Sequence, residues 1–322
     1  QSIMRADVDY TALGWHEITR ILLRVIGIPL LLWLDMGLIG IVIYSSIVNS
    51  MFFALALLHI KHKYGRYFIN LKMINKNISM ELMNFGKYAL VSQVAEFFKY
   101  RVDSLLVGLL VGIPAVAGYA IMVVLIDMLA QIQMRLQSYW DTVIIRQIGE
   151  GNPLAATHTM LKSLQLGLAF TLLAITNAYW FADIFLGVWV GNQYLPLQPL
   201  LVIFITVLAG SALQLATTPY FNALNYAKLN AGLGLAEVLL KLIVVAPLVM
   251  LFQAKGVIYA TVLATLLVSL GVRLWYLAPI TGFGYGQLTQ KILKPLLPLF
   301  AGLAVLVLFY QICLLLLSST WA

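Results

Sequence analysis

Residues 231–252 read AGLGLAEVLLKLIVVAPLVMLF, an almost unbroken apolar run in which Glu237 and Lys241 are the charged side chains. A helix needs about 20 predominantly apolar residues to cross the hydrocarbon core of a bilayer, and this run reaches that length. It predicts a membrane-spanning helix. The run decides the fold class, because most of the chain repeats its pattern.

Nine stretches of this kind follow one another along the 322 residues. The composition agrees, since 62% of the residues are hydrophobic and 10% are charged, whereas soluble domains carry about 25% charged residues. A soluble fold is therefore excluded, and we predict an all-α, polytopic integral membrane bundle of about nine transmembrane helices. The nine predicted spans are 18–34, 38–60, 85–110, 115–136, 159–180, 195–215, 231–252, 257–277 and 295–317.

The basic residues predict how this bundle lies in the membrane. Lys and Arg collect in cytoplasmic loops, and ten of them fall in alternate loops, against Lys255 in the loops between. The rich side is therefore predicted to be cytoplasmic, and the net charge of +8 is explained without nucleic acid. The ten are Arg5, Lys61, Lys63, Arg66, Lys72, Lys76, Arg146, Lys228, Lys291 and Lys294. Six more, assigned to helix ends on the same side, are Arg20, Arg24, Lys87, Arg135, Lys162 and Arg273.

The third predicted span carries four ionisable residues near its middle, in the sequence QVAEFFKYRVD at residues 93–103. At about 100° per residue, Glu96, Lys99 and Asp103 share one helix face, while Arg101 points elsewhere. Ionisable groups inside a membrane normally face a water-filled cavity or one another. Two interpretations stay open: a hydrophilic cavity in which Lys99 and Arg101 meet an anionic substrate, or a self-neutralised stripe that fixes helix packing.

Two further spans carry charge at depth. Asp127 lies with Gln131 and Arg135 at successive i,i+4 steps in the fourth span, and it either faces the same cavity or packs within the bundle. In the seventh span, Glu237 and Lys241 stand at i,i+4 spacing in the favourable order. We expect these two to form a structural pair, with a coupling role as the alternative.

Signatures of enzymes are missing from the sequence. It contains no His-Glu-x-x-His pair and no Gly-x-Ser-x-Gly elbow, the patterns of zinc proteases and of α/β-hydrolases. The chain holds one cysteine, Cys313, so neither a disulfide framework nor a thiolate metal site is expected. We predict no enzymatic activity, no metal and no cofactor.

The residues 97–120, FFKYRVDSLLVGLLVGIPAVAGYA, resemble polysaccharide exporters of the multidrug/oligosaccharidyl-lipid/polysaccharide flippase superfamily. In that family a membrane Asp is followed by an apolar run ending in Gly, a tight turn, and Gly-Tyr opening the next helix. Asp103, Gly108, Gly112, Gly118 and Tyr119 stand at those positions. Residues 187–194 and 256–267 are also similar to that family's later helices, and the spacing agrees over most of 18–277.

The resemblance implies a division of the chain and a place for it in a two-lobed fold. Residues 1–60 would be the end of an N-terminal lobe, 61–84 a basic cytoplasmic linker, 85–277 a C-terminal lobe of six helices, and 278–322 a loop with an extra span. About four helices would precede this chain in a complete flippase, so it is expected to be a fragment.

The resemblance also implies a function. Family members move undecaprenyl-pyrophosphate-linked oligosaccharide across the bacterial cytoplasmic (inner) membrane for surface polysaccharide such as O-antigen. Lys99 and Arg101 would then attract the pyrophosphate, and Glu96, Asp103 or Asp127 would take up a proton or ion. The expected partners are this lipid-linked substrate, membrane lipids and a polysaccharide polymerase.

Three other functions compete with this interpretation. A cation-coupled multidrug exporter of the same superfamily should present net acidic groups. A membrane-embedded glycosyltransferase or polysaccharide ligase should carry a large outer loop with clustered Arg, His or acidic residues, whereas the outer loops here are short. A purely structural membrane subunit should tolerate neutral replacements at Lys99, Arg101 and Asp103.

Overall fold

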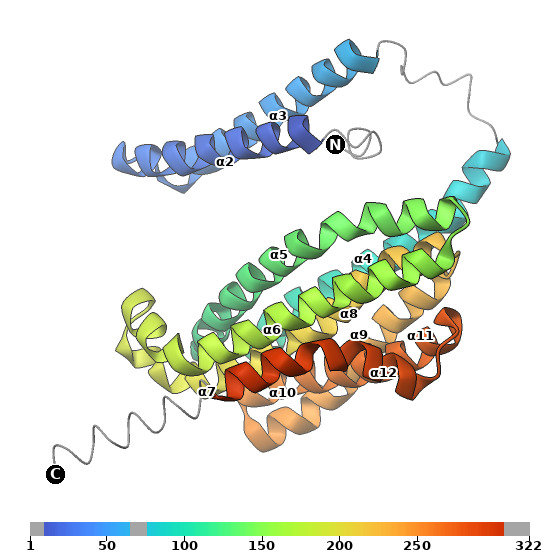
Figure 1. The fold of residues 1–322 in the computed structure, drawn as a ribbon. Coiled ribbons are helices and arrows are strands. Elements are labelled where there is room, and N and C mark those ends of the chain that lie inside the picture. The colour runs from blue at the N-terminus through green and yellow to red at the C-terminus, as the bar shows by residue number, and fades with distance from the viewer. Residues whose placement is uncertain (1–9, 65–75, 306–322) are drawn as a thin grey trace. The chain divides into compact units, whose positions relative to one another are not determined.

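The computed structural model describes residues 10–64 and 76–305, and these form helices joined by short turns (Figure 1). The chain divides into two compact units, Gln1–Ser79 and Met80–Ala322. The helices are α2 (Tyr10–Trp33), α3 (Gly37–Tyr64), α4 (Lys76–Leu110), α5 (Ile113–Gly149), α6 (Pro153–Trp189), η2 (Asn192–Leu197), α7 (Gln198–Ile205), α8 (Val207–Ala223), α9 (Ala227–Phe252), α10 (Ala254–Thr265), η3 (Leu266–Val272), α11 (Arg273–Thr281), α12 (Tyr285–Leu293) and η4 (Lys294–Leu296).

The prediction of an all-α polytopic membrane bundle is confirmed. Among the described residues, seven helical stretches are long and apolar enough to cross a membrane. They are Gly37–His59, Ala115–Gly149, Pro153–Trp189, Asn192–Ala223, Ala227–Phe252, Ala254–Thr281 and Tyr285–Val305. The other two predicted spans, 18–34 and 85–110, lie in α2 and α4, which are helical but carry more charge.

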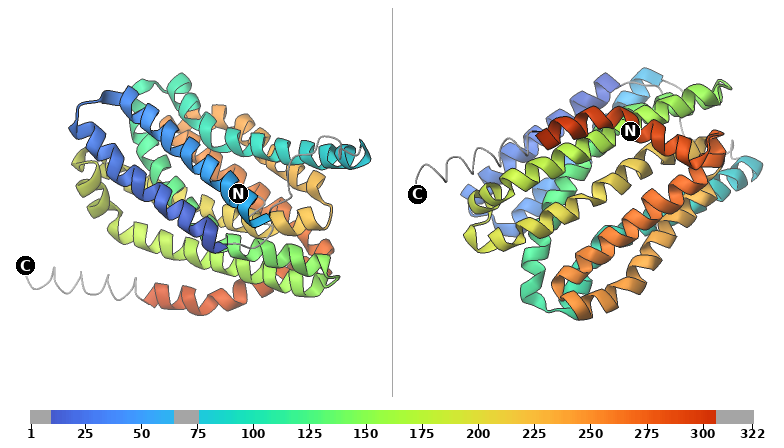
Figure 2. Two further views of the ribbon diagram at one scale, coloured as in Figure 1. Left: turned by 90° about the horizontal axis from the view of Figure 1, so that it is seen from above. Right: turned by 60° about the horizontal axis from the view of Figure 1, so that its bottom comes forward.

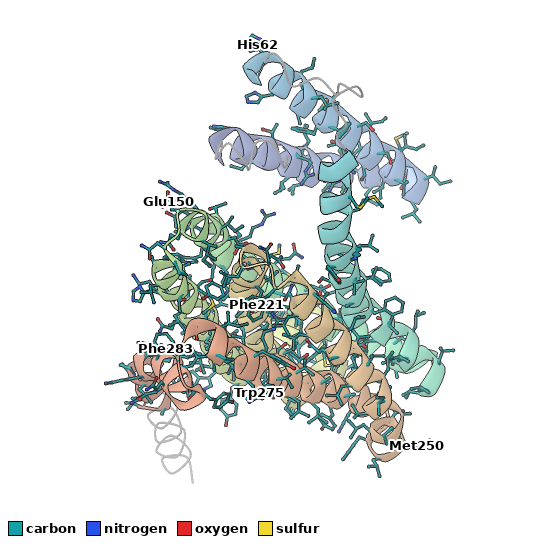
Figure 3. All side chains as sticks on the ribbon, turned by 90° about the vertical axis from the view of Figure 1, so that its right-hand side faces the viewer. His62, Glu150, Phe221, Met250, Trp275 and Phe283 are labelled. Atoms are coloured by element: carbon teal, nitrogen blue, oxygen red, sulfur yellow. The ribbon has the colours of Figure 1, made fainter. Side chains whose placement is uncertain are left out.

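The surface of the molecule is apolar, as a bilayer requires. Val188 is 86% exposed, Met250 85% and Leu109 82%, and exposing side chains of this size to water would cost free energy. Figure 3 shows Met250 at the edge of the Met80–Ala322 unit, whereas Phe221 lies inside it and is fully buried. Lipid chains are the solvent that suits such a surface.

In the first unit, α2 and α3 form an antiparallel hairpin. The turn between them places Asp35 and Gly37 at positive φ, and the Tyr44 hydroxyl donates to the Leu23 carbonyl across the pair at 2.7 Å. A Cβ at Gly27 would lie 2.2 Å from the Tyr44 hydroxyl. Glycine at this position therefore lets the tyrosine cross to the facing helix.

The predicted linker 61–84 is partly helical. Helix α3 continues to Tyr64 and α4 begins at Lys76, so both ends of that segment belong to helices, and residues 65–75 lie outside the described part of the chain. The predicted span 295–317 is likewise described only as far as Val305.

In the second unit, α5 and α6 are the longest helices, each of 37 residues, and they pack with α8 (Figures 1 and 2). Two buried glutamines on α5 bind both neighbours. Gln133 donates to the carbonyls of Gly167 and Leu208 at 3.0 and 3.1 Å, and one turn later Gln137 donates to those of Ser163 and Ala212. These amides fix the three helices side by side.

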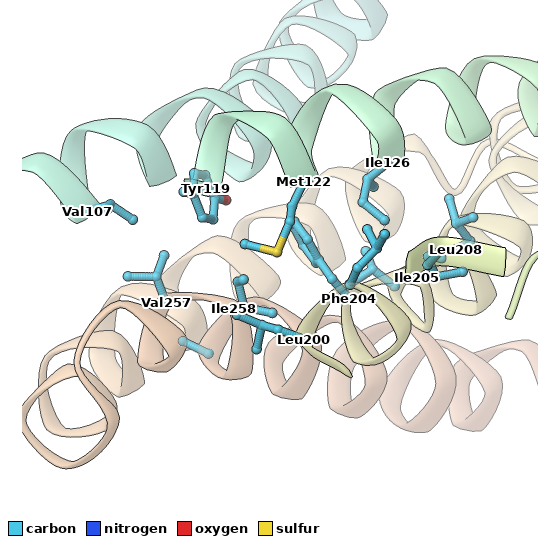
Figure 4. Packing of buried hydrophobic residues seen from close by; sticks show 14 of the residues in the cluster. Val107, Tyr119, Met122, Ile126, Leu200, Phe204, Ile205, Leu208, Val257 and Ile258 are labelled. Atoms are coloured by element: carbon cyan, nitrogen blue, oxygen red, sulfur yellow. The ribbon is translucent and has the colours of Figure 1, made fainter. Parts of the chain in front are cut away.

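Two apolar clusters fill this unit. One lies where α4 ends and α5, α7, α9 and α10 meet, and Figure 4 shows Tyr119, Met122 and Phe204 packed within it. The other cluster joins α8 and α11 to the C-terminal end of α5 and the N-terminal end of α6. Polar side chains lie between α9 and the helices α10, η3 and α11.

Candidate functional site

Asp103 on α4 is the centre of the buried polar groups. Its side chain is 1% exposed. The hydroxyls of Tyr119 on α5 and Thr261 on α10 donate to Oδ2 at 2.6 and 3.0 Å, and Lys241 on α9 forms an ion pair with Oδ1. One carboxylate therefore joins four helices, and the predicted site residue Asp103 binds an ammonium group from a distant part of the sequence.

Glu237 lies one turn before Lys241 on α9 and is 3% exposed. It accepts hydrogen bonds from Thr265 at 2.5 Å and from Ser269 at 3.1 Å. The sequence predicts Glu237 and Lys241 as partners of each other. The structure gives each of them a partner on another helix as well: Thr265 and Ser269 bind Glu237, and Asp103 binds Lys241.

Arg273 is buried, which the sequence did not predict. It was assigned with other basic residues to a helix end on the cytoplasmic side, but its side chain is 2% exposed. Nη1 donates to Thr217 Oγ1 and to Asn230 Oδ1, both at 2.9 Å, and the guanidinium lies 5.9 Å from the Phe221 ring centroid. Arg273 is a second cation in the interior of the unit.

A regular spacing in the sequence could have identified Arg273 as a residue that faces the interior. Thr261, Thr265, Ser269 and Arg273 follow one another at every fourth residue, and all four face α9 or α4 through the hydrogen bonds above. We call these four, with Asp103, Tyr119, Thr217, Asn230, Glu237 and Lys241, the polar seam. It runs along α9 in the middle of a bundle whose outer surface is apolar.

The π-helix η3 keeps this spacing on one face. A step of four residues overshoots an α-helical turn of about 3.6 residues by about 40°, so three such steps would carry Arg273 away from Thr261. A π-helix has wider turns, closed by i→i+5 hydrogen bonds, and η3 occupies Leu266–Val272 between Thr265 and Arg273. The wide turns offset the drift and bring Arg273 back toward α9.

A small cavity lies beside the polar seam, with a volume of about 20 Å³. Four helices supply its polar lining. These residues are Ser92 on α4, Gln214 on α8, Asn230 and Glu237 on α9, and Arg273 on α11. Gly234 on α9 faces Ala95 on α4 beside this cavity, and a Cβ at Gly234 would lie in ordinary van der Waals contact with that of Ala95, at 3.6 Å.

The remaining predicted residues lie on α4 and α5. Glu96, Lys99 and Arg101 are in α4, within two turns before Asp103, and their side chains lie outside the described part of the structure. Asp127 is partly buried on α5, two turns after Tyr119. Of the predicted site residues, the structure therefore brings Asp103 and Lys241 into contact. Glu237 lies one helical turn from Lys241 in the same polar seam.

The charges in the polar seam balance. Among the described residues, the buried charged side chains are Asp103, Glu237, Lys241 and Arg273, two acids and two bases. An unpaired charge at the centre of a bilayer is costly, and the ion pair of Asp103 with Lys241 lowers that cost. No protein-family model matches the chain, and neither a curated protein nor a solved structure matches it.

Proposed function

We propose that the chain is part of a membrane transporter that flips undecaprenyl-pyrophosphate-linked oligosaccharide across the bacterial inner membrane for surface polysaccharide synthesis. The observation that supports transport is the polar seam: four ionisable residues buried within a helical membrane unit. Each ionisable residue costs at least about 2.5 kcal/mol on insertion scales, and such residues usually mark pathways for ions or substrates.

The substrate class rests on the residues of α4. Lys99 and Arg101 lie within about one turn of Asp103, and Arg and Lys are the side chains that bind phosphate oxygens most strongly. In the proposed cycle these two cations attract the pyrophosphate, while the lipid tail stays in the bilayer. Asp103 is held by Lys241, Tyr119 and Thr261 and keeps α4 in register with α9.

The balance of charge in the polar seam favours this substrate over cationic drugs. A site for a drug cation needs an excess of carboxylates that attract it, whereas the four buried charges of the described residues cancel. A lipid-linked substrate with a pyrophosphate group would instead be attracted by the cations Lys99 and Arg101 on α4.

The test is display of surface polysaccharide in cells that lack their own flippase. The complete gene is supplied as wild type, as Lys99→Ala with Arg101→Ala, and as Lys255→Ala, a control that removes one positive charge from an exposed position at the start of α10. We expect display with wild type and Lys255→Ala, and at least a tenfold loss with the double variant at equal membrane abundance. Equal display from all three would remove Lys99 and Arg101 from the substrate site.

A second assay separates the proposal from a drug exporter. Efflux of a fluorescent cationic dye is measured in the same cells, with and without the gene. We expect no effect on dye efflux. Gene-dependent dye efflux without polysaccharide display would support the exporter in place of the flippase.

A further inference from the structure

The buried Arg273 guanidinium has a polar group that the protein leaves without a partner. Nη1 is bound to Thr217 and Asn230, but Nε has no hydrogen-bond partner among the described groups, although the side chain is 2% exposed. A buried donor without an acceptor costs free energy comparable to a lost hydrogen bond. Buried polar groups in native proteins are therefore almost always bound, to protein or to ordered water.

Arg273 also lines the cavity of about 20 Å³ beside the seam. A cavity needs about 10–15 Å³ to hold one water molecule, and the water needs two to four polar partners. Here the lining offers Ser92, Gln214, Asn230 and Glu237 in addition to Arg273. The volume and the polarity of the site both fit one water.

The charges around the cavity exclude an ion as its occupant. The Arg273 guanidinium repels a cation and the Glu237 carboxylate repels an anion, since both line the same small space. A neutral molecule that both donates and accepts hydrogen bonds suits both groups.

We propose that this cavity binds a single water molecule, which accepts a hydrogen bond from Arg273 Nε and donates one to the Glu237 carboxylate. The water completes the hydrogen bonding of the guanidinium and connects the two charges that lie at the Arg273 end of the polar seam. Ser92 and Gln214 extend this contact to α4 and α8. The inference concerns the interior of the unit and does not rest on the proposed substrate.

Two glycines on α9 supply the test. A Cβ at Gly234 would line the cavity without a clash, 3.6 Å from Ala95 Cβ, whereas a Cβ at Gly232 would meet nothing within 4 Å. Both Gly→Ala changes raise helix propensity alike, so Gly232→Ala is the matched control. Thermal unfolding of the purified full chain is measured for both.

If a water is bound, the methyl group of Gly234→Ala expels it and leaves Arg273 Nε without a partner. Gly234→Ala is then expected to melt at a lower temperature than Gly232→Ala. If the cavity is dry, the methyl group fills a void, and Gly234→Ala should melt at the same or a higher temperature, which would overturn the proposal.

A density map of the native protein in lipid, at a resolution that shows ordered waters, gives an independent answer if Gly234→Ala does not fold. A peak within hydrogen-bonding distance of both Arg273 Nε and Glu237 supports the water site. A cavity without density there, or one filled by a side chain of α4, contradicts it.

Discussion

At the scale of the residue, Asp103 binds one ammonium and two hydroxyl groups with a single carboxylate. Removing one member of a buried ion pair leaves the other charge without compensation, which costs about 3–5 kcal/mol, whereas replacing both members by neutral groups of similar shape is often close to neutral. The pair of Asp103 and Lys241 is therefore best examined by a double-mutant cycle.

We predict that Lys241→Met lowers the free energy of unfolding by about 3–5 kcal/mol. Adding Asp103→Asn should restore most of this loss, because asparagine still accepts hydrogen bonds from Tyr119 and Thr261 and carries no charge. Unfolding in detergent, followed by circular dichroism, measures both variants. Additive losses in the double variant would show that the two residues do not act as a pair.

The matched control is the surface pair of Arg146 and Glu150, which lies at i,i+4 spacing with side chains 79% and 56% exposed. Exposed ion pairs contribute little to stability. Arg146→Met should leave the unfolding midpoint within the error of the measurement. The contrast isolates the effect of burial, since both substitutions remove one cation from an ion pair.

The sequence predicts that Asp103, Glu237 and Lys241 lie inside the membrane, because each interrupts an apolar run. It does not predict the partners that these residues have on other helices. Asp103 and Lys241 lie far apart in the chain, and their pairing depends on how α4 packs against α9. The burial of Arg273 was not predicted, because this residue stands near the end of its predicted span, 257–277, where basic residues usually reach the interface. The π-helix turns its side chain inward instead.

At the scale of the element, the close hairpin of α9 and α10 depends on a glycine. Gln253 turns the chain at a φ of 52°, and a Cβ at Gly256 would lie 2.3 Å from the backbone oxygen of Leu248. A backbone atom cannot move aside as the end of a side chain can. The two helices must separate if any side chain stands at this position.

We predict that Gly256→Ala lowers the free energy of unfolding by about 1–3 kcal/mol, the usual cost of forcing extra atoms into a packed interior. Gly232→Ala on α9, where a Cβ meets nothing, serves as the control and should be neutral or stabilising. Thermal unfolding of the two variants is compared. Equal stability of both would mean that the hairpin has room at Gly256.

The predicted spans agree with the observed helices because summed hydropathy over about 20 residues is a strong signal. The gaps between predicted spans at 111–114 and 253–256 contain the turns that join α4 to α5 and α9 to α10, and the structure shortens these turns to 111–112 and Gln253. The π-helix was not predicted. Its extra residue per turn is stabilised by tertiary partners such as Glu237, which the local sequence does not reveal.

At the scale of the whole molecule, the distribution of basic residues predicts one orientation in the membrane. Lys228 lies near the start of α9 and Lys255 near the start of α10, so α9 separates them. Lys228 lies on the side whose loops hold most of the Lys and Arg residues, which is predicted to be cytoplasmic, and Lys255 lies on the opposite side.

We predict that Lys255→Cys reacts with a membrane-impermeant thiol reagent in intact cells, whereas Lys228→Cys reacts only after the membrane is opened. Both variants are made with Cys313→Ser, which removes the one native cysteine. The opposite pattern would reverse the orientation. Reaction of both residues from the same side would contradict a membrane-crossing α9.

The π-helix η3 limits how many residues its part of the chain can hold between α10 and α11. Inserting one more residue within Leu266–Val272, beyond the extra residue that the π-helix already holds, would rotate every later residue of that helix by about 100°. Arg273 would then leave Thr217 and Asn230, which hold it at 2.9 Å, and turn toward lipid. Substitutions in η3 can be mild, but an insertion there would turn a charge toward the bilayer.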